Sequence, residues 1–271
     1  MSDKTYPVGL RRGINFGLGL LLTLILSQCM SHVSPPPPPA EGYVSRAPAA
    51  GKLRERPGLG TQLGEEIRDV STSTIFYRKS VGTPDAVASF HYNDAEGAKL
   101  MAEMSGRAIK RSGSFELVPG KLRVSVVSRY SWSGGGYDHY WAGGKAYVIG
   151  VPGEGYRLQI ENLTKTRMEV VISIDGLDVL DGQVASVHKR GYIIAARSTA
   201  SIRGMRVGGK LKELLFGTVA ASRAATAFGE KGARNVGVIG VACYEEDEAA
   251  RRRVRVQENY LRDGARAFGV D

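Results

Sequence analysis

The stretch from residue 155 to 181 places the strongest restriction on the fold, because its apolar residues alternate with polar ones. The alternating apolar residues are Tyr156, Leu158, Ile160, Met168, Val170, Ile172 and Ile174. A period of two is typical of β-strands, whereas a helix repeats every 3.6 residues. A polar connector at 162–166 joins the two sets, and Asp175-Gly176 suits the positive φ of a tight turn. We therefore predict a half-buried antiparallel hairpin, with one face in a core and the other in water.

Short apolar runs recur along the rest of the chain, and turn residues separate them. The runs lie at 73–78, 87–92, 121–129, 146–151, 184–187, 191–196 and 201–207. Regularly spaced short strands are typical of sandwiches and barrels. The fold class predicted is mainly β, an antiparallel β-sandwich at 71–244 with a C-terminal α-helix at 245–271, and the pattern allows one further short helix.

Two local patterns add detail to this prediction. Residues 94–110 have apolar positions at helical spacing, with Asp94 as the expected N-cap. Residues 235–244 are almost wholly apolar, which predicts a central strand buried on both faces. Cys243 lies in this strand and is expected to be a small buried residue without a disulfide partner.

Residues 1–28 have the pattern of a signal peptide. A basic start at Lys4, Arg11 and Arg12 precedes a thirteen-residue apolar run at 14–26. A membrane span needs about 20 apolar residues, so this run is short for one. The run ends in Leu26-Ser27-Gln28-Cys29, which resembles the lipobox of bacterial lipoproteins, although Gln28 stands where the family usually has Gly, Ala or Ser.

The lipobox resemblance implies that Cys29 becomes the mature N-terminus and carries acyl chains, which hold the protein to a bilayer. The residue after the cysteine is Met30 rather than the Asp that retains such proteins in the inner membrane, which implies a lipid-anchored protein of the outer membrane. The alternative is an uncleaved signal anchor that spans residues 13–30.

Residues 29–70 are expected to form a spacer between the lipid and the folded body. Five consecutive prolines at 35–39 favour a stiff polyproline II segment. The residues from 40 to 69 are rich in Gly, Ala, Pro, Arg and Glu and contain few large apolar side chains. That composition predicts a disordered tether.

Four segments between residues 155 and 246 carry a second resemblance. They read ENLT at 161–164, VVISIDGLDVLDG at 170–182, RGYII at 190–194 and ARNVGVIGVACYEE at 233–246. In this order they are similar to an uncharacterised domain of bacterial envelope proteins. The resemblance implies a β-sandwich module and brings no activity or catalytic residue with it.

The net charge of the chain is +10, and most of it belongs to the predicted body. Residues 71–244 hold 23 Lys and Arg against 14 Asp and Glu. An excess of this kind attracts anionic partners such as lipid headgroups, acidic glycans or nucleic acid, and it also keeps a protein soluble. The predicted basic face consists of Lys189, Arg190, Arg197, Arg203 and Arg206.

Residues 130–147 combine bulky aromatic rings with five glycines. Aromatic rings on a flexible glycine-rich loop are suited to stacking on sugars, peptides or lipid headgroups. The predicted binding residues of this aromatic loop are Tyr130, Trp132, Tyr137, Tyr140 and Trp141. The alternative is that some of these rings fold back over the edge of the sandwich.

The sequence points to binding rather than catalysis, and no cofactor is expected. The chain lacks G-x-S-x-G and H-E-x-x-H motifs. Asp175, Asp178 and Asp181 form a weak candidate for calcium. We predict an outer-membrane lipoprotein with a binding or structural role in the cell envelope, which contacts a protein or an anionic surface through the aromatic loop and the basic stretch at 189–212. The alternatives are an enzyme acting on envelope glycan, with Asp138 or Glu154 as its acid, and nucleic-acid binding by the basic face.

Overall fold

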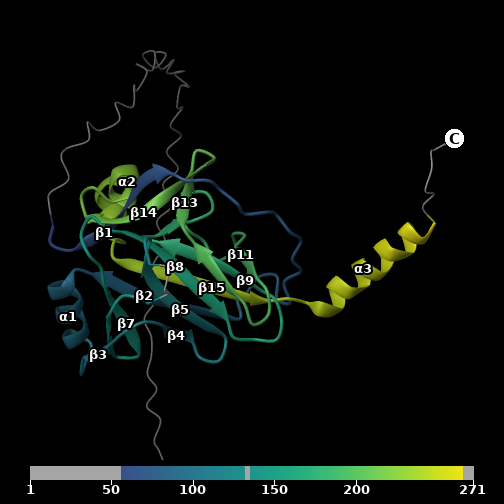
Figure 1. Cartoon of the computed structure of the whole chain (residues 1–271), viewed down its shortest axis with the longest axis horizontal. Helices are drawn as coiled ribbons and strands as arrows, with labels where there is room; N and C mark the ends of the chain where they lie inside the picture. The colour runs from purple at the N-terminus through teal and green to yellow at the C-terminus, as the bar shows by residue number, and fades with distance from the viewer. Residues whose placement is uncertain (1–55, 132–134, 265–271) are drawn as a thin grey trace, which may run out of the picture. The chain divides into compact units, whose positions relative to one another are not determined.

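The computed structural model describes residues 56–131 and 135–264, which form two packed β-sheets and three helices (Figure 1). The first sheet has seven strands within these ranges. Five of them run in the order β1 (Leu59–Glu66), β14 (Lys210–Thr218), β8 (Gly155–Asn162), β5 (Leu122–Ser128) and β4 (Phe115–Val118). The other two lie beside this path, β12 (Thr199–Ile202) paired with β8 and β13 (Gly204–Val207) paired with β14. The predicted mainly β sandwich is confirmed.

The second sheet has eight strands within the same described ranges. Their order is β10 (Leu177–Asp178), β9 (Met168–Ile174), β15 (Val238–Glu245), β2 (Ala86–Asn93), β7 (Lys145–Ile149), β6 (His139–Ala142) and β3 (Ile109–Arg111), with β11 (Tyr192–Ile194) beside β9. Strands β2 and β7 pair in parallel, and the other paired strands are antiparallel. The second sheet is therefore a mixed sheet, with one parallel pair of strands.

The core lies between the two sheets and consists of the inward-facing residues of both. Phe216 of β14 is fully buried at its centre. Its ring stacks on Tyr156 with centroids 4.2 Å apart and lies 5.6 Å from the ring of Tyr92 in the opposite sheet. The alternating positions Leu158 and Ile160 are buried as predicted. Burial of an aliphatic side chain of this size contributes about 1.5–3 kcal/mol.

The predicted hairpin of residues 155–174 is wrong, because its two strands belong to different sheets. Strand β8 pairs with β5, β12 and β14, whereas β9 pairs with β15, β10 and β11. The predicted wet face of β9 is also covered, since Val171 is buried against Phe76 and the buried Glu169 pairs with Arg78 at 2.6 Å. A period of two shows which side chains share a face but does not identify the neighbouring strand.

Asn162 holds the connection that crosses between the sheets. Its buried side-chain amide donates to the carbonyl oxygens of Thr166, at 2.8 Å, and Ala195, at 3.0 Å. Its Oδ1 accepts from the backbone N–H of Thr164 at 2.9 Å. The connector is thus folded around one polar side chain. The Asp175-Gly176 turn forms as predicted, with φ values of 55° and 79°, but it joins β9 to β10.

The structure corrects the N-terminal boundary of the body. Residues 59–66, which composition placed in the spacer, form β1 and pair with β14. The predicted strand at 73–78 does not form, apart from a single bridge between Arg78 and Glu246. Position 60 of β1 must be a glycine, because Gly60 packs so closely on Ser222 and Val236 that a Cβ would clash with both. The rest of the predicted spacer up to residue 55 lies outside the described residues.

The described residues also form three helices. The first, α1 (Ala95–Met104), packs on β6 and β7, and Asp94 caps it as predicted by accepting from the N–H of Gly97 at 2.7 Å. It ends at Met104, short of the predicted residue 110, because Gly106 has a positive φ of 134° that a helix cannot contain. The second is α2 (Arg223–Ala233). The predicted C-terminal helix is confirmed as α3 (Glu248–Asp263), which buries none of its residues. Among the described residues no helix is long and apolar enough to cross a membrane.

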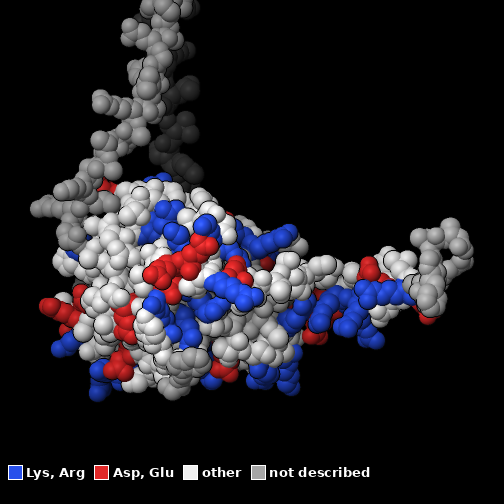
Figure 2. Space-filling model, turned by 45° about the horizontal axis from the view of Figure 1, so that its top comes forward, with Lys and Arg blue, Asp and Glu red and all other residues white. Residues whose placement is uncertain are grey.

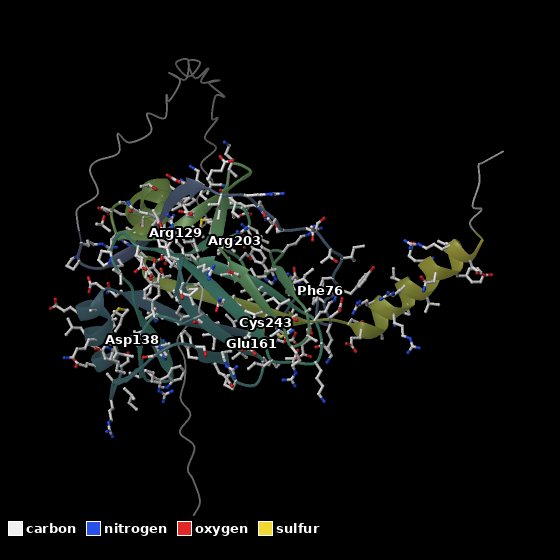
Figure 3. The ribbon with its side chains drawn as sticks, viewed as in Figure 1. Phe76, Arg129, Asp138, Glu161, Arg203 and Cys243 are labelled. Carbon is white, nitrogen blue, oxygen red and sulfur yellow. The ribbon has the colours of Figure 1, made fainter. Side chains whose placement is uncertain are left out.

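Strand β15 occupies the centre of the second sheet, between β9 and β2, as the apolar run predicted. Cys243 lies inside it and is fully buried (Figure 3). Burial raises the pKa of its thiol to about 11. The thiol therefore stays protonated at neutral pH and behaves as a small apolar group, which confirms the prediction.

Candidate functional site

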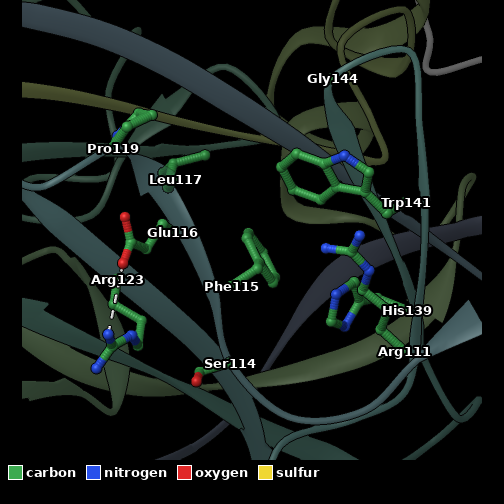
Figure 4. A pocket seen from close by; sticks show the side chains of 10 residues that line it. All are labelled: Arg111, Ser114, Phe115, Glu116, Leu117, Pro119, Arg123, His139, Trp141 and Gly144. Carbon is green, nitrogen blue, oxygen red and sulfur yellow. Dashed lines mark hydrogen bonds and ion pairs between the residues drawn. The ribbon is translucent and has the colours of Figure 1, made fainter.

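The two sheets end side by side at one corner of the sandwich, and a cleft opens there. Strand β3 is the last strand of the second sheet and β4 the last of the first, and only residues 112–114 connect them. The cleft between them has a volume of about 490 Å³. Figure 4 shows the main side chains around it, which come from β3, β4, β5 and β6 and include Arg111, Phe115, Arg123, His139 and Trp141.

His139 is the most unusual residue of this cleft. Its side chain is buried, and its ring centroid lies 4.9 Å from that of Phe115. Neither Nδ1 nor Nε2 meets the geometry of a hydrogen bond in the part of the chain that the structure describes, although the backbone of Tyr137 lies close enough to oppose, in small part, the lowering of the ring's pKa by burial. Buried polar groups are nearly always hydrogen-bonded, and one without a partner needs an explanation. Both nitrogens are shielded from solvent, so a molecule in the cleft could bond to the ring after a small shift of the side chains around it.

The charge beside it comes from Arg111, which faces His139 across the β3–β6 pair. The guanidinium carbon of Arg111 lies 5.5 Å from the ring centroid of Trp141, a cation–π distance. Arg111 has no ion-pair partner among the described residues. Burial, and next the Arg111 charge, lower the pKa of His139, so its ring is neutral at neutral pH. The site therefore combines one free cation with a neutral imidazole.

The second arginine of the cleft is already neutralised. Arg123 pairs with Glu161 at 2.8 Å and with Glu116 at 3.5 Å. It borders a second hollow of about 460 Å³ on the other side of Ser114. Because both partners are carboxylates on neighbouring strands, Arg123 supports the wall of the cleft and leaves Arg111 as its free positive charge.

The predicted aromatic loop is in large part a β-hairpin. Tyr140 and Trp141 belong to β6, and the turn at Gly143 and Gly144, whose φ values are 55° and 75°, leads directly into β7. These two glycines therefore serve a tight turn and not a flexible platform. The idea of one continuous exposed loop is wrong for residues 139–147.

The five predicted aromatic residues do not gather on one surface. Tyr137 packs edge-on against Phe216 in the core, with ring centroids 5.6 Å apart. Tyr130 is exposed beside Arg129. Trp132 lies outside the described residues. Trp141 borders the cleft. Tyr137 instead fits the alternative in which some rings fold back over the sandwich.

Most of the predicted basic face is engaged within the chain. The five predicted residues are Lys189, Arg190, Arg197, Arg203 and Arg206. Lys189 pairs with Asp181 at 2.8 Å, and Arg206 donates to Asp69 at 2.6 Å. Arg203 donates to a backbone carbonyl oxygen at 2.9 Å. Figure 2 shows acidic side chains among the basic ones on the face in view. Internal pairing reduces the field available to an anionic partner.

The basic residues and the cleft also belong to different parts of the body. Asp138, which directly precedes His139, lies well apart from Arg203 in Figure 3. The sequence had suggested one partner held by aromatic and basic residues together. The structure separates the two groups. Among the described residues, Arg111, which the prediction did not include, is the one cation that stacks on Trp141.

The weak calcium candidate is wrong. Asp175 is buried in the core and accepts hydrogen bonds from three donors, and Asp181 pairs with Lys189. Asp178 is buried in β10, and its carboxylate accepts a hydrogen bond from the backbone N–H of Leu180 at 2.8 Å. Within residues 56–131 and 135–264, no three acidic, histidine or cysteine side chains are grouped to hold a metal ion. The three aspartates serve turns and ion pairs.

Asp138 does not have the properties of the glycan-cleaving acid considered above. It bonds to Lys110 at 2.9 Å and to Ser112 at 2.6 Å, and the Lys110 contact holds its pKa below the usual range. A general acid needs a raised pKa so that it is protonated at neutral pH. Glu154, the other candidate acid, lies in the connection before β8. Its backbone carbonyl oxygen accepts a hydrogen bond from the backbone N–H of Phe216 at 3.0 Å.

The fold and the cleft together define a β-sandwich with a ligand-sized site at the edge where its two sheets meet. Protein-family models, curated proteins and solved structures were all compared with this chain, and none matches it. The function is therefore inferred from the chemistry of the cleft. Sequence reasoning missed Arg111, Phe115 and His139, and the one available signal was the hairpin pattern around Gly143-Gly144.

Proposed function

We propose that this chain is a lipid-anchored binding protein of the bacterial envelope, and that its sandwich holds a ligand in the cleft between β3, β4 and β6. The observation that supports the proposal is the buried His139, whose two ring nitrogens have no partner among the described residues and which borders the cleft beside Arg111. A ligand there would satisfy groups that the fold leaves unbonded.

Binding is favoured over glycan cleavage by the carboxylates of the cleft. Glycoside hydrolases generally use two carboxylates that flank the scissile bond. Among the described lining residues the cleft has one acidic side chain, Glu116, and it is paired with Arg123. The nucleic-acid alternative is not favoured either, because three of the five predicted basic residues are bonded within the chain.

The ligand itself can be sought on the protein purified under native conditions. We expect a small molecule to be released on denaturation of the wild-type chain and identified by mass spectrometry. The matched variant is His139→Phe, which keeps a ring of similar size but removes both nitrogens. Loss of the compound from this variant, with an unchanged melting temperature, supports the cleft. Equal recovery from both proteins would mean that the molecule binds elsewhere.

The anchor is the second part of the proposal and rests on the lipobox resemblance of residues 26–29. Cys29 and the signal-like segment before it lie outside the described residues. An acyl-modified Cys29 would attach the chain to the outer membrane, and the proline-rich residues that follow would separate the body from the lipid.

Replacing Cys29 by Ala is expected to release the protein from the membrane fraction, because the acyl chains would have no attachment site. Fractionation of cells after a high-salt wash measures this directly. The control is Cys243→Ala, which changes the buried cysteine and should leave the protein on the membrane. Retention of the Cys29→Ala protein in the membrane fraction would exclude the lipid anchor and favour the uncleaved span at 13–30.

A further inference from the structure

The chemistry of the cleft indicates the class of molecule that it binds. We infer that it recognises a carboxylate carried on an apolar or ring-shaped body, with Arg111 and His139 bonding to the carboxylate and Phe115 and Trp141 contacting the body. This inference rests on the proposed function, because it specifies the ligand of the same site.

The requirement for an anion comes from Arg111. Its guanidinium is held near the face of Trp141, and no carboxylate of the described chain pairs with it. A guanidinium has five N–H donors and no acceptor, and its planar fork matches the two oxygens of a carboxylate. In Figure 4 the guanidinium lies between the indole of Trp141 and the imidazole of His139. An anion bound to Arg111 would lie beside the His139 ring, whose nitrogens are shielded from solvent and become accessible to it when a neighbouring side chain shifts.

The charge balance favours a monoanion over a phosphate. Arg123 is neutralised by Glu161 and Glu116, which leaves Arg111 as the unpaired charge of the described lining. His139 is neutral, so it offers one N–H donor and one acceptor. A phosphate group carries nearly two negative charges. Phosphate sites usually add a helix N-terminus or a glycine-rich loop, whereas here the charged and polar groups stand on strands.

The walls of the cleft favour an apolar or flat body. Phe115 is largely buried and packs against both His139 and Trp141. Leu117 and Pro119 extend the same wall toward solvent. Aromatic faces bind flat apolar groups and sugar rings by contact over their area. The carboxylate would then lie at the Arg111 end and the body along Phe115.

Four probes test the inference on the full-length chain. Trp132→Phe is introduced first, because the chain has two tryptophans and Trp141 then becomes the single fluorescent reporter. The probes are phenylacetate, its neutral analogue phenylacetamide, glucuronate and inorganic phosphate. We expect phenylacetate to change Trp141 emission in a saturable manner, and phenylacetamide to bind about tenfold more weakly or worse, since hydrogen bonds to charged groups are the stronger ones.

The matched variants separate charge from shape. In Arg111→Met, phenylacetate affinity should fall about tenfold or more, while phenylacetamide affinity stays the same. The control Arg107→Met removes an exposed arginine outside the cleft and should change neither. The imidazole nitrogen-15 resonances of His139 should shift on addition of phenylacetate, because one ring nitrogen gains a hydrogen-bond partner.

The outcomes distinguish the ligand class from the proposed function. Tighter binding of glucuronate than of phenylacetate supports the inference and identifies the body as a sugar ring. Equal affinity for phenylacetate and phenylacetamide, or tighter binding of phosphate, overturns the carboxylate class but keeps a ligand-binding cleft. If no probe changes Trp141 emission and His139→Phe retains every bound molecule, both the inference and the proposed function are wrong.

Discussion

A chain that starts at residue 70 is expected to lose its stable fold, although the residues removed look like part of a spacer. The chain that starts at residue 56 should remain folded, because it keeps β1. Strand β1 pairs with β14 from Leu59 onward and covers the edge of the first sheet. Urea denaturation of the two chains, or their soluble yield, measures the difference.

The expected loss is large because β1 supplies both apolar and polar contacts to the core. Leu59 is buried, which contributes about 2 kcal/mol. The N–H of Thr61 donates to Asp175 at 2.8 Å, and its hydroxyl bonds to Tyr92 at 2.8 Å and Tyr156 at 2.6 Å. Each buried group left without its partner costs about 1–3 kcal/mol.

The total loss is therefore about 5 kcal/mol or more, which is comparable to the whole stability of a domain. Thr61→Val provides a finer test, since valine has a similar shape but removes the hydroxyl. Its expected cost is about 1–3 kcal/mol. Equal urea midpoints for the chains starting at 56 and 70 would show that the body folds without β1.

The local structure of this protein could be predicted where one residue type determines a backbone conformation. Asp94 caps α1, Asp175-Gly176 makes a tight turn, and Cys243 lies in a buried central strand. The cap and the turn follow from interactions within a few residues, and the buried strand follows from an almost wholly apolar run. The alternating pattern in β8 and β9 also predicted strands correctly, because alternation depends only on the pleat.

The pairing of strands could not be predicted in the same way. Strands β8 and β9 are neighbours in sequence, yet the side-chain bonds of Asn162 fold the connector so that it crosses to the other sheet. Nothing in a period of two distinguishes this crossing from a hairpin. Strand β1 was missed for a related reason, since a strand with small residues gains its stability from the neighbour that it pairs with.

The candidate cleft is the clearest consequence of this limit. Arg111, Phe115 and His139 come from three strands, and only the pairing of β3 with β6 and the meeting of β3 with β4 bring them together. The sequence showed the aromatic residues around Trp141 but not the charge beside them. Residues that share a site by strand pairing have no fixed spacing in the chain.

Asp175 is expected to make the stability of the body depend on pH. Its side chain is buried and accepts hydrogen bonds from the hydroxyl of Tyr92 at 2.7 Å and from the N–H groups of Thr61 and Gly237. Burial raises its pKa from an ordinary 3.8 to about 6, although these hydrogen bonds oppose the shift. The folded chain therefore binds a proton at Asp175 more readily than the unfolded chain does.

The sign of the pH effect follows from this difference in proton binding. Between about pH 4 and pH 6 the folded state holds the Asp175 proton and the unfolded state has released it. The contribution of Asp175 to stability is therefore fully present below about pH 4 and is lost as the pH rises through about 6. A shift of about two pKa units corresponds to roughly 3 kcal/mol.

Comparison with Asp175→Asn isolates this contribution, because other titrating groups are common to both proteins. Asparagine does not titrate, and its amide N–H₂ group opposes one of the three donors, so the variant is less stable than wild type at low pH. The free energy of unfolding of wild type minus that of the variant should decrease by roughly 3 kcal/mol between about pH 4 and pH 7. Urea titrations at several pH values provide the measurement.

The matched control is Asp69→Asn. Its carboxylate bonds to Ser71 and Arg206, and chiefly the Ser71 bonds lower its pKa to about 2. The contribution of Asp69 is present above about pH 4 and is lost only as the pH falls toward 2, so the wild-type minus Asp69→Asn difference should stay nearly flat from about pH 5 to pH 7. A wild-type minus Asp175→Asn difference that stays constant or grows with pH would show that the three hydrogen bonds outweigh burial and that Asp175 is ionised in the folded protein.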